Sequence, residues 1–165
     1  MGSHVVNMLA RSGVKRIRIV DFDRVSLSSL NRHSCAVRSD VGASKVECLK
    51  NYIGKILPHI QIETVEAYVT VENAAELLVQ GIDYVVDCID NLDAKAEVVS
   101  LCRERNIKMI CSGGAGMKSD PTKLQIRDIS DCKYDNLIMR LKRELTKKGI
   151  KNGVKVAFSY QPADK

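Results

Sequence analysis

The sequence lacks both a long apolar run and a secretory signal. No segment approaches the ~20 apolar residues that a membrane-spanning helix needs, and no signal peptide is visible at the amino terminus. Hydrophobic residues make up 45% of the 165 positions, which is enough for the core of one domain, and nothing marks the chain as fibrous or disordered. These absences predict a soluble intracellular protein that is not secreted, and they leave open an anchor or address in a preceding segment.

The six cysteines lack the C-x-x-C pairs that hold zinc in many proteins. They are scattered through the predicted strands and helices, at Cys35, Cys48, Cys88, Cys102, Cys111 and Cys132. This spacing argues against a paired-thiolate zinc site and predicts reduced thiols instead of a disulfide framework. A cysteine at a strand end, such as Cys111, is typical of a buried small apolar residue. We therefore expect no cysteine nucleophile and no zinc.

One stretch near the amino terminus carries chemistry, because an apolar strand there ends in two acids. The β-branched run at residues 17–20 is followed by Asp21 and Asp23. A buried parallel strand delivers such acids to the carboxyl edge of its sheet, where doubly wound sheets bind ligands. A carboxylate can accept hydrogen bonds from both hydroxyls of a ribose, so we expect Asp21 to bind the ribose of a nucleotide.

Two basic residues follow these acids. Arg32 can grip phosphate oxygens through its planar fork, and Lys45 can act as a point charge. Lys45 lies on the first turn of a predicted helix, where a cation gains nothing from the helix dipole, and this indicates an anionic partner. The polar residues 26–39 predict a loop over a nucleotide triphosphate. A plain solvated connection and a solvent-facing Lys45 are the alternatives.

A second acid-ended strand is predicted at residues 84–89, which form an apolar run that leads to Asp90. Carboxylate and phosphate oxygens suit Mg²⁺, so Asp90 is predicted to bind magnesium together with the outer phosphates. Asp87 lies inside the strand pattern and is interpreted as structural. Further on, the glycine-rich residues 112–116 predict a turn that allows close backbone approach to a ligand, which is weak evidence for phosphate binding.

Helical and strand periodicities alternate along the chain and predict an α/β fold of the Rossmann type. We expect a mostly parallel sheet with helices on both faces, in a single domain over residues 1–165. The expected helices cover residues 5–11, 42–57, 73–80, 94–105 and 137–148, and the expected strands cover residues 16–20, 60–65, 84–89 and 108–111.

The net charge is concentrated near the carboxyl terminus. Residues 133–155 carry eight basic and two acidic residues, a balance of +6, which is the net charge of the whole chain. Within this segment the apolar residues form one stripe of a predicted helix, and basic residues lie largely around its other side: Arg140, Lys142, Arg143, Lys147 and Lys148. Such a one-sided basic helix favours contact with an RNA backbone, and a solvated face is the alternative.

Several blocks resemble the adenylating enzymes related to ubiquitin-activating enzymes, the ThiF-type superfamily. They are D-F-D-x-V-x-x-S-x-L-N-R from position 21, G-x-x-K at 42–45 and D-C-I-D-N at 87–91. A further block, G-G-A-G-x-x-S-D-P-T-K at 113–123, is similar to the tRNA threonylcarbamoyladenosine dehydratases. The resemblance runs nearly end to end. It implies an enzyme that uses ATP and Mg²⁺ to activate the threonylcarbamoyl carboxylate on a tRNA adenosine and then closes it into a ring.

The resemblance also implies site residues and partners. Arg32, Lys45 and Asp90 are the expected catalytic residues, with Asp90 as the magnesium ligand. The residues expected to bind the nucleotide are Gly2, Ser3, Asp21, Asp23, Ser29, Asn31, Arg32, Lys45, Asp90 and Asn91. The implied partners are tRNA and a second copy of the chain in a homodimer. The implied location is the cytoplasm or the mitochondrion, because eukaryotic relatives associate with the mitochondrial outer membrane.

Three departures from the family pattern affect the implied nucleotide site. Family members begin with a strand and a G-x-G-x-x-G-S loop, and here only Gly2 and Ser3 match it, so the first strand and the phosphate-binding glycines are expected to be missing. Residues 1–4 have an alternative interpretation as a cloning leader. Ser29 replaces a frequent Asn, and Asn31 replaces a frequent Gln. We therefore expect this chain to bind ATP poorly even where the full protein is active.

Two other functions remain open at this point. The first is an activating enzyme for a ubiquitin-like or sulfur-carrier protein, which the lack of paired cysteines and the block at 113–123 argue against. The second is a nucleotide-binding or dimerising subunit that has lost catalysis. A pyrophosphate-exchange assay with carrier protein and with tRNA separates these functions from the dehydratase.

Overall fold

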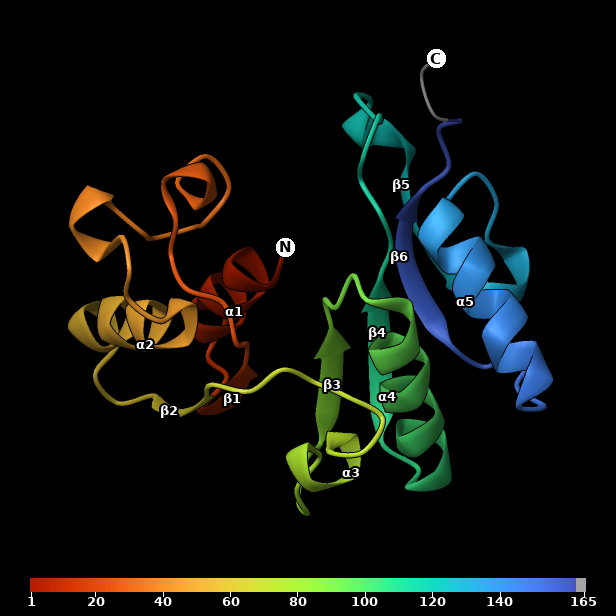
Figure 1. Cartoon of the computed structure of the whole chain (residues 1–165), viewed down its shortest axis with the longest axis horizontal. Coiled ribbons are helices and arrows are strands. Elements are labelled where there is room, and N and C mark those ends of the chain that lie inside the picture. The colour runs from red at the N-terminus through yellow and green to blue at the C-terminus, as the bar shows by residue number, and fades with distance from the viewer. Residues whose placement is uncertain (163–165) are drawn as a thin grey trace. The chain divides into compact units, whose positions relative to one another are not determined.

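The computed structural model describes residues 1–162 of an α/β chain that divides into two compact units (Figure 1). One unit runs from Met1 to Val69, and the other begins at Thr70. The helices are α1 (Gly2–Arg11), α2 (Lys45–Ile56), α3 (Ala74–Leu77), α4 (Leu92–Glu104) and α5 (Asn136–Lys147). The strands are β1 (Arg16–Val20), β2 (Gln61–Val65), β3 (Tyr84–Asp87), β4 (Lys108–Ser112), β5 (Leu124–Asp128) and β6 (Lys155–Ser159).

The first unit is built on the parallel pair β1 and β2, against which α1 and α2 pack (Figure 1). Its core is formed by one apolar face of each helix and by the inward side of β1, with the buried residues Val6, Ala10, Ile19, Val46, Leu49 and Ile53. Gly13 follows α1 with a φ of +91°, a conformation that favours glycine after a helix end. Pro58 follows α2 and prevents the helix from continuing.

The second unit is a four-stranded sheet in the order β3-β4-β6-β5. β3, β4 and β6 run parallel, and β5 pairs antiparallel with β6 at one edge. α4 and α5 contact each other, and their inward faces bury Val99, Leu141 and Leu145. Because β3 and β4 are parallel, their carboxyl ends meet at one edge of this sheet, and the loop that leaves β3 opens there.

The predicted α/β fold with mostly parallel strands is confirmed, and every predicted helix and strand is present. Boundaries differ by a few residues, as at α1, which begins at Gly2 instead of residue 5, and at α3, which ends at Leu77 instead of residue 80. In residues 1–162 no helix combines the length and the apolar composition needed to cross a membrane.

The sequence patterns do not predict β5 and β6. On β5, Leu124 and Ile126 alternate with polar residues, but the strand has only five residues and both apolar side chains are exposed, so the alternation does not mark a buried face. On β6, Val156 and Phe158 alternate and are buried, but the strand is short and begins at Lys155, inside the basic segment. Its pairing with β4 and β5, which lie earlier in the sequence, is a tertiary contact that local periodicity does not encode.

The glycine-rich turn after β4 is occupied by a side chain of the protein itself. The buried carboxylate of Asp135 accepts a hydrogen bond from Gly114 N at 2.9 Å and caps α5 by accepting one from Ile138 N at 3.0 Å. A Cβ atom on Gly113 would overlap Asp135 Oδ2 and lie 3.0 Å from Phe158 Cβ. The close backbone approach predicted for residues 112–116 is therefore made to Asp135.

Replacing Gly113 by alanine is expected to destabilise the protein by about 1–3 kcal/mol, because the new methyl group must displace a buried capping carboxylate. Urea unfolding followed by circular dichroism measures this change. The matched control is Gly116→Ala in the same turn, where an added Cβ meets no atom within 4 Å. Equal stability of the two variants would show that the turn accommodates a side chain at both positions.

Candidate functional site

Asp21 and Asp23 lie at the carboxyl edge of β1, as predicted. The amide of Asp21 continues the sheet by donating to Val65 O at 3.2 Å, and Asp21 Oδ1 accepts a hydrogen bond from Asp23 N at 2.9 Å. Both acids are partly exposed. Asp21 therefore keeps carboxylate oxygen capacity at the sheet edge, where a ribose diol could donate to it.

Lys45 is the first residue of α2, and the structure brings it to the acids. Its Nζ lies 2.5 Å from Asp23 Oδ2, and its amide donates to Asp23 O at 3.0 Å. The Lys45 side chain is only 18% exposed, whereas the Asp23 side chain is 45% exposed. Lys45 balances one of the two carboxylates at the sheet edge, and the amino end of α2 adds backbone amides that can bind an anion.

The loop between β1 and α2 holds Ser29 inside and leaves Asn31 and Arg32 outside. Ser29 is buried, and its hydroxyl accepts from Ser26 N at 3.2 Å in a capped 3₁₀ turn (Leu27–Ser29). Arg32 Nη1 donates to Ser28 O at 2.6 Å and to Asn31 Oδ1 at 3.1 Å. The guanidinium of Arg32 is thus exposed and bonded to its own loop, and only part of its donor set is used.

The amino end of α1 lies against the same loop. Ser3 Oγ accepts from Ser34 N at 3.1 Å, and Ser3 O accepts from Ser34 Oγ at 2.9 Å. His4 Nε2 lies 3.0 Å from Arg32 O. Gly2 begins the helix and Ser3 follows it, so both residues expected at the nucleotide stand at a helix amino terminus, which is a natural place for an anion.

His33 marks where these elements meet, although its role is not predicted from the sequence. Burial lowers the pKa of His33, the charge of Lys45 lowers it further, and the charge of Asp21 raises it. His33 therefore lies within electrostatic range of both the sheet edge and the start of α2. The structure gathers the amino ends of α1 and α2, the β1 edge and the intervening loop in one unit.

In the second unit, Asp90 and Asn91 lie in the loop that follows β3. Asp90 is exposed. Asn91 caps α4, because its Oδ1 accepts a hydrogen bond from Ala94 N at 3.1 Å. The carboxylate of Asp90 is thus available to a ligand at the carboxyl edge of β3, whereas the side-chain oxygen of Asn91 already serves the helix.

A buried ion pair behind this loop is not predicted from the sequence. Lys95 Nζ on α4 lies 2.7 Å from Asp87 Oδ2, and both side chains are fully buried. Lys95 also donates to Ile89 O at 2.8 Å, and Asp87 Oδ1 accepts from Ile89 N at 2.9 Å. The pair fixes the backbone between β3 and Asp90, which supports the structural interpretation of Asp87. The sequence signal for Lys95 is a lysine between two alanines in the first turn of the predicted helix.

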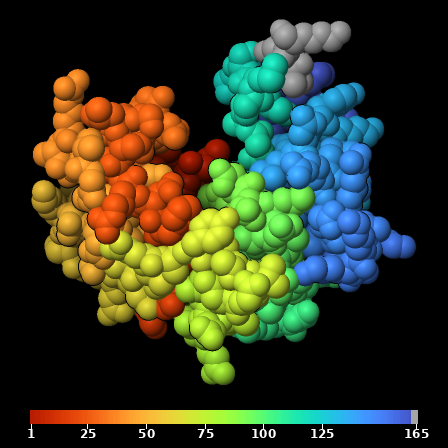
Figure 2. Space-filling model, in the orientation of Figure 1, coloured from red at the N-terminus to blue at the C-terminus, as the bar shows by residue number. Residues whose placement is uncertain are grey.

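The predicted basic helix is α5, whose segment forms an outer surface of the second unit, drawn in blue in Figure 2. Arg140 and Arg143 are exposed. The other three basic groups are engaged: Lys142 donates to Ser130 O at 2.5 Å, Lys147 pairs with Glu144 at 2.8 Å and Lys148 pairs with Glu97 at 2.6 Å. Among the five candidates, the two arginines are therefore the groups most open to an external phosphate.

Comparison with known proteins places this architecture in a family. The model of the ThiF family matches residues 1–155. The chain is 47% identical over 166 residues to tRNA threonylcarbamoyladenosine dehydratase 2 of Saccharomyces cerevisiae, and the alignment covers 99% of this chain and 37% of the relative. It is 39% identical over 159 residues to tRNA threonylcarbamoyladenosine dehydratase of Bacillus subtilis, and this alignment covers 96% of this chain and 63% of the relative.

The fold is also that of a solved structure. The crystal structure of Escherichia coli tRNA N6-threonylcarbamoyladenosine dehydratase, TcdA, in complex with ATP matches with a TM-score of 0.93 and 33% sequence identity, over 99% of this chain and 70% of that chain. The chain spans 37% and 63% of the length of the two curated relatives. Because the family model matches nearly all of the sequence and relatives align along it, the chain belongs to the ThiF family.

Proposed function

We propose that the protein containing this sequence is an ATP-dependent tRNA threonylcarbamoyladenosine dehydratase. The observation that carries the proposal is the likeness, over 99% of this chain, to a yeast dehydratase and to the ATP-bound E. coli enzyme. The cluster of Asp21, Asp23 and Lys45 beside two helix amino termini supports it, because a carboxylate can accept from the ribose, and a lysine and helix amino termini can bind phosphate.

The proposed reaction has two steps. An oxygen of the threonylcarbamoyl carboxylate attacks the α-phosphorus of ATP, and the bond to pyrophosphate breaks. A nitrogen of the same group then attacks the activated carbonyl carbon, the ring closes and AMP leaves. Adenylation is needed because a carboxylate oxygen is a poor leaving group and AMP is a good one. Over both steps the substrate loses one water molecule, whose elements appear in AMP and pyrophosphate.

Each residue of the first unit has a role set by its chemistry. Asp21 accepts hydrogen bonds from the ribose, and Lys45 neutralises charge on the phosphates as pyrophosphate leaves. Arg32 is exposed on its loop and can exchange its bond to Ser28 O for a bidentate contact with phosphate oxygens. Because Lys45 is paired with Asp23 at 2.5 Å, phosphate binding must compete with that carboxylate.

Magnesium is the expected companion of the triphosphate, and Asp90 fits it. An exposed carboxylate offers a hard oxygen ligand, and Mg²⁺ is commonly held by one or two carboxylates, water and substrate phosphates. When bound, the ion offsets the charge that develops on the leaving pyrophosphate. The buried pair of Asp87 and Lys95 holds the backbone that presents Asp90.

The proposed partners are tRNA, through the α5 face, and a second copy of the protein in a homodimer. The charge of residues 133–155 supports the first, because a balance of +6 on one segment attracts a polyanion. The proposed location is intracellular, in the cytoplasm or the mitochondrion, because the proposed substrate, tRNA, is found there.

Neutralising Arg140 and Arg143 with glutamine should reduce the salt dependence of tRNA binding. Each phosphate contact contributes about 0.7–0.9 to the slope of log affinity against log salt, so the slope should fall by up to about 1.4–1.8. The Lys147→Gln and Lys148→Gln pair should change it less, because their ammonium groups are already paired with Glu144 and Glu97. A salt titration of tRNA binding by fluorescence anisotropy measures all three slopes.

The control for this titration removes the same charge elsewhere in the second unit. Lys108→Gln with Lys123→Gln changes two exposed lysines outside the basic segment. An unaltered slope in the arginine pair, or an equal fall in the control pair, would mean that α5 is only a solvated face. ATP affinity serves as a second readout and should be unchanged, because α5 is not among the proposed nucleotide ligands.

The proposed function is tested with the full-length protein, ATP, magnesium and tRNA that carries threonylcarbamoyladenosine. Nuclease digestion and mass spectrometry should show ATP-dependent loss of one water from the modified nucleoside, with equal formation of AMP. The same nucleosides in tRNA from cells lacking the gene should keep the open form. Pyrophosphate exchange stimulated by a sulfur-carrier protein and indifferent to tRNA would identify a carrier-activating enzyme. ATP binding without either turnover would identify a subunit that has lost catalysis.

A further inference from the structure

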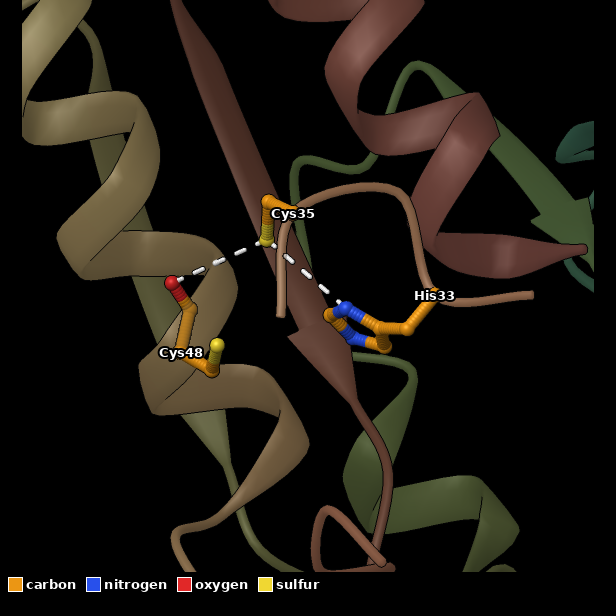
Figure 3. Close-up of side chains that lie close together, drawn as sticks. All are labelled: His33, Cys35 and Cys48. Carbon is orange, nitrogen blue, oxygen red and sulfur yellow. Dashed lines mark hydrogen bonds between the residues drawn. The ribbon is translucent and has the colours of Figure 1, made fainter. Parts of the chain in front are cut away.

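Three side chains with nitrogen or sulfur ligand atoms meet between α2 and the loop that connects β1 to α2. His33 and Cys35 lie on the loop, and Cys48 lies on α2 (Figure 3). One ligand atom from each residue lies within 4.8 Å of the other two. Cys35 Sγ is 3.7 Å from His33 Nδ1 and 4.0 Å from Cys48 O. The two loop residues are separated from Cys48 by 12 positions, so the cluster has the form H-x-C-x₁₂-C.

The polar atoms of this cluster are poorly satisfied by the protein alone. His33 Nδ1, the ring nitrogen that faces Cys35 Sγ, accepts a hydrogen bond from Ala36 N at 3.1 Å. Cys48 is buried, and burial together with the nearby Cys35 raises its pKa to about 12. Burial also raises the pKa of Cys35. The side chains of the cluster bond each other weakly, as the 3.7 Å contact of Cys35 Sγ with His33 Nδ1 shows.

We propose that His33, Cys35 and Cys48 form a binding site for a soft divalent metal ion, with Zn²⁺ as its natural occupant. Two thiolates and one imidazole are a ligand set that zinc prefers, at about 2.3 Å from sulfur and about 2.0–2.1 Å from nitrogen. Ligands at these distances in a tetrahedron lie roughly 3.6 Å apart. The three atoms therefore need to close by only about an ångström from their present limit of 4.8 Å.

Binding involves no redox change. Each thiol releases its proton to solvent as a sulfur–metal bond forms, and the two thiolates balance the charge of the ion. His33 Nδ1, which faces Cys35 in Figure 3, exchanges its bond with Ala36 N for the metal, and Nε2 keeps its proton. Asp40 Oδ2 lies 3.4 Å from Cys48 Sγ, so this carboxylate or a water molecule would supply the fourth ligand.

The absence of C-x-x-C pairs excludes only one arrangement of zinc ligands. Here two ligands come from a loop and the third from α2, and their spacing in the sequence does not indicate that they lie close together. A metal at this place would join the loop that carries Arg32 to the helix that begins at Lys45. This consequence for nucleotide binding rests on the proposed function, whereas metal binding itself does not.

The test uses full-length protein that has been reduced, treated with a chelator and titrated with Co²⁺ without ATP or tRNA. Thiolate ligands give near-ultraviolet charge-transfer bands, and a tetrahedral site gives intense visible bands, so both should rise to one equivalent. Added Zn²⁺ should abolish them. Cys35→Ser should remove about half of the charge-transfer intensity and weaken Co²⁺ binding at least tenfold, and Cys48→Ser should act in the same way.

His33→Ala separates metal binding from folding and from thiol chemistry, because it keeps both sulfur atoms. It should weaken Co²⁺ binding at least tenfold while charge-transfer bands persist at saturating metal. The matched controls are Cys88→Ser and Cys132→Ser, which lie in the second unit and should leave the spectrum unchanged. Circular dichroism confirms that each variant is folded. No thiolate bands in the parent protein, or bands that survive both Cys35→Ser and Cys48→Ser, would overturn the proposal, whatever the outcome of the dehydratase assay.

Discussion

Replacing Lys45 by alanine in the full-length protein should lower the rate of adenylate formation about 10²–10³-fold, because one preorganised charge is removed from the departing phosphates. The protein should remain folded. The ion pair of Lys45 with Asp23 is partly exposed, at 18% and 45% of the two side chains, and pairs of this kind contribute about 0–1 kcal/mol to stability. ATP–pyrophosphate exchange measures the rate, and thermal unfolding measures the stability.

The matched control for Lys45 lies one turn further along the same helix. Lys50 is exposed and forms a weak ion pair with Glu47 at 3.9 Å, so Lys50→Ala removes the same charge from α2 without touching the sheet edge. Its exchange rate should stay within about twofold of the parent, which corresponds to roughly 0.4 kcal/mol. Similar losses of exchange rate in Lys45→Ala and Lys50→Ala would mean that only the net charge of α2 matters. Lys45 would then not be a phosphate ligand.

Replacing Lys95 by methionine should destabilise the protein by about 3–5 kcal/mol, because it leaves the Asp87 carboxylate buried without its partner. Methionine has a similar length and fits the space, so the loss comes from the uncompensated charge and not from a cavity. Urea unfolding of the second unit, followed by circular dichroism, gives the free energy. A fall of this size would measure the cost of leaving the Asp87 carboxylate without its partner, and not a net contribution of the pair to stability.

The double variant Asp87→Asn with Lys95→Met tests the cause. The amide keeps an oxygen for Ile89 N, and no charge is buried, so the double variant should be more stable than Lys95→Met alone. Lys148→Met is the matched control, because it removes a lysine that pairs with Glu97 of the same helix, α4, at a partly exposed position and should change stability by about 0–1 kcal/mol. Strictly additive effects of Asp87→Asn and Lys95→Met would show that the pair is not coupled.

Local sequence determined the elements of this chain because their signals lie within a few residues. The apolar period of residues 46–57 predicts α2, and the β-branched run at 16–20 predicts β1, since each element must bury one face. The acids at 21 and 23 follow from the same logic, because a strand that ends in carboxylates presents them at a sheet edge. The pairing of Lys45 with Asp23 confirms that the edge and the helix start adjoin.

Tertiary structure alone decided which distant residues meet. β6 pairs with β4 although more than 40 residues separate them in the sequence. Lys95 on α4 pairs with Asp87 on β3. No local pattern in the sequence around these residues predicts either contact. His33, Cys35 and Cys48 come together only because the loop folds back onto α2. Sequence periodicity indicates which face an element buries. The partner that covers this face is decided by the packing between elements. Inside the protein the dielectric constant is low, so each buried polar group needs a specific hydrogen-bonding or charged neighbour.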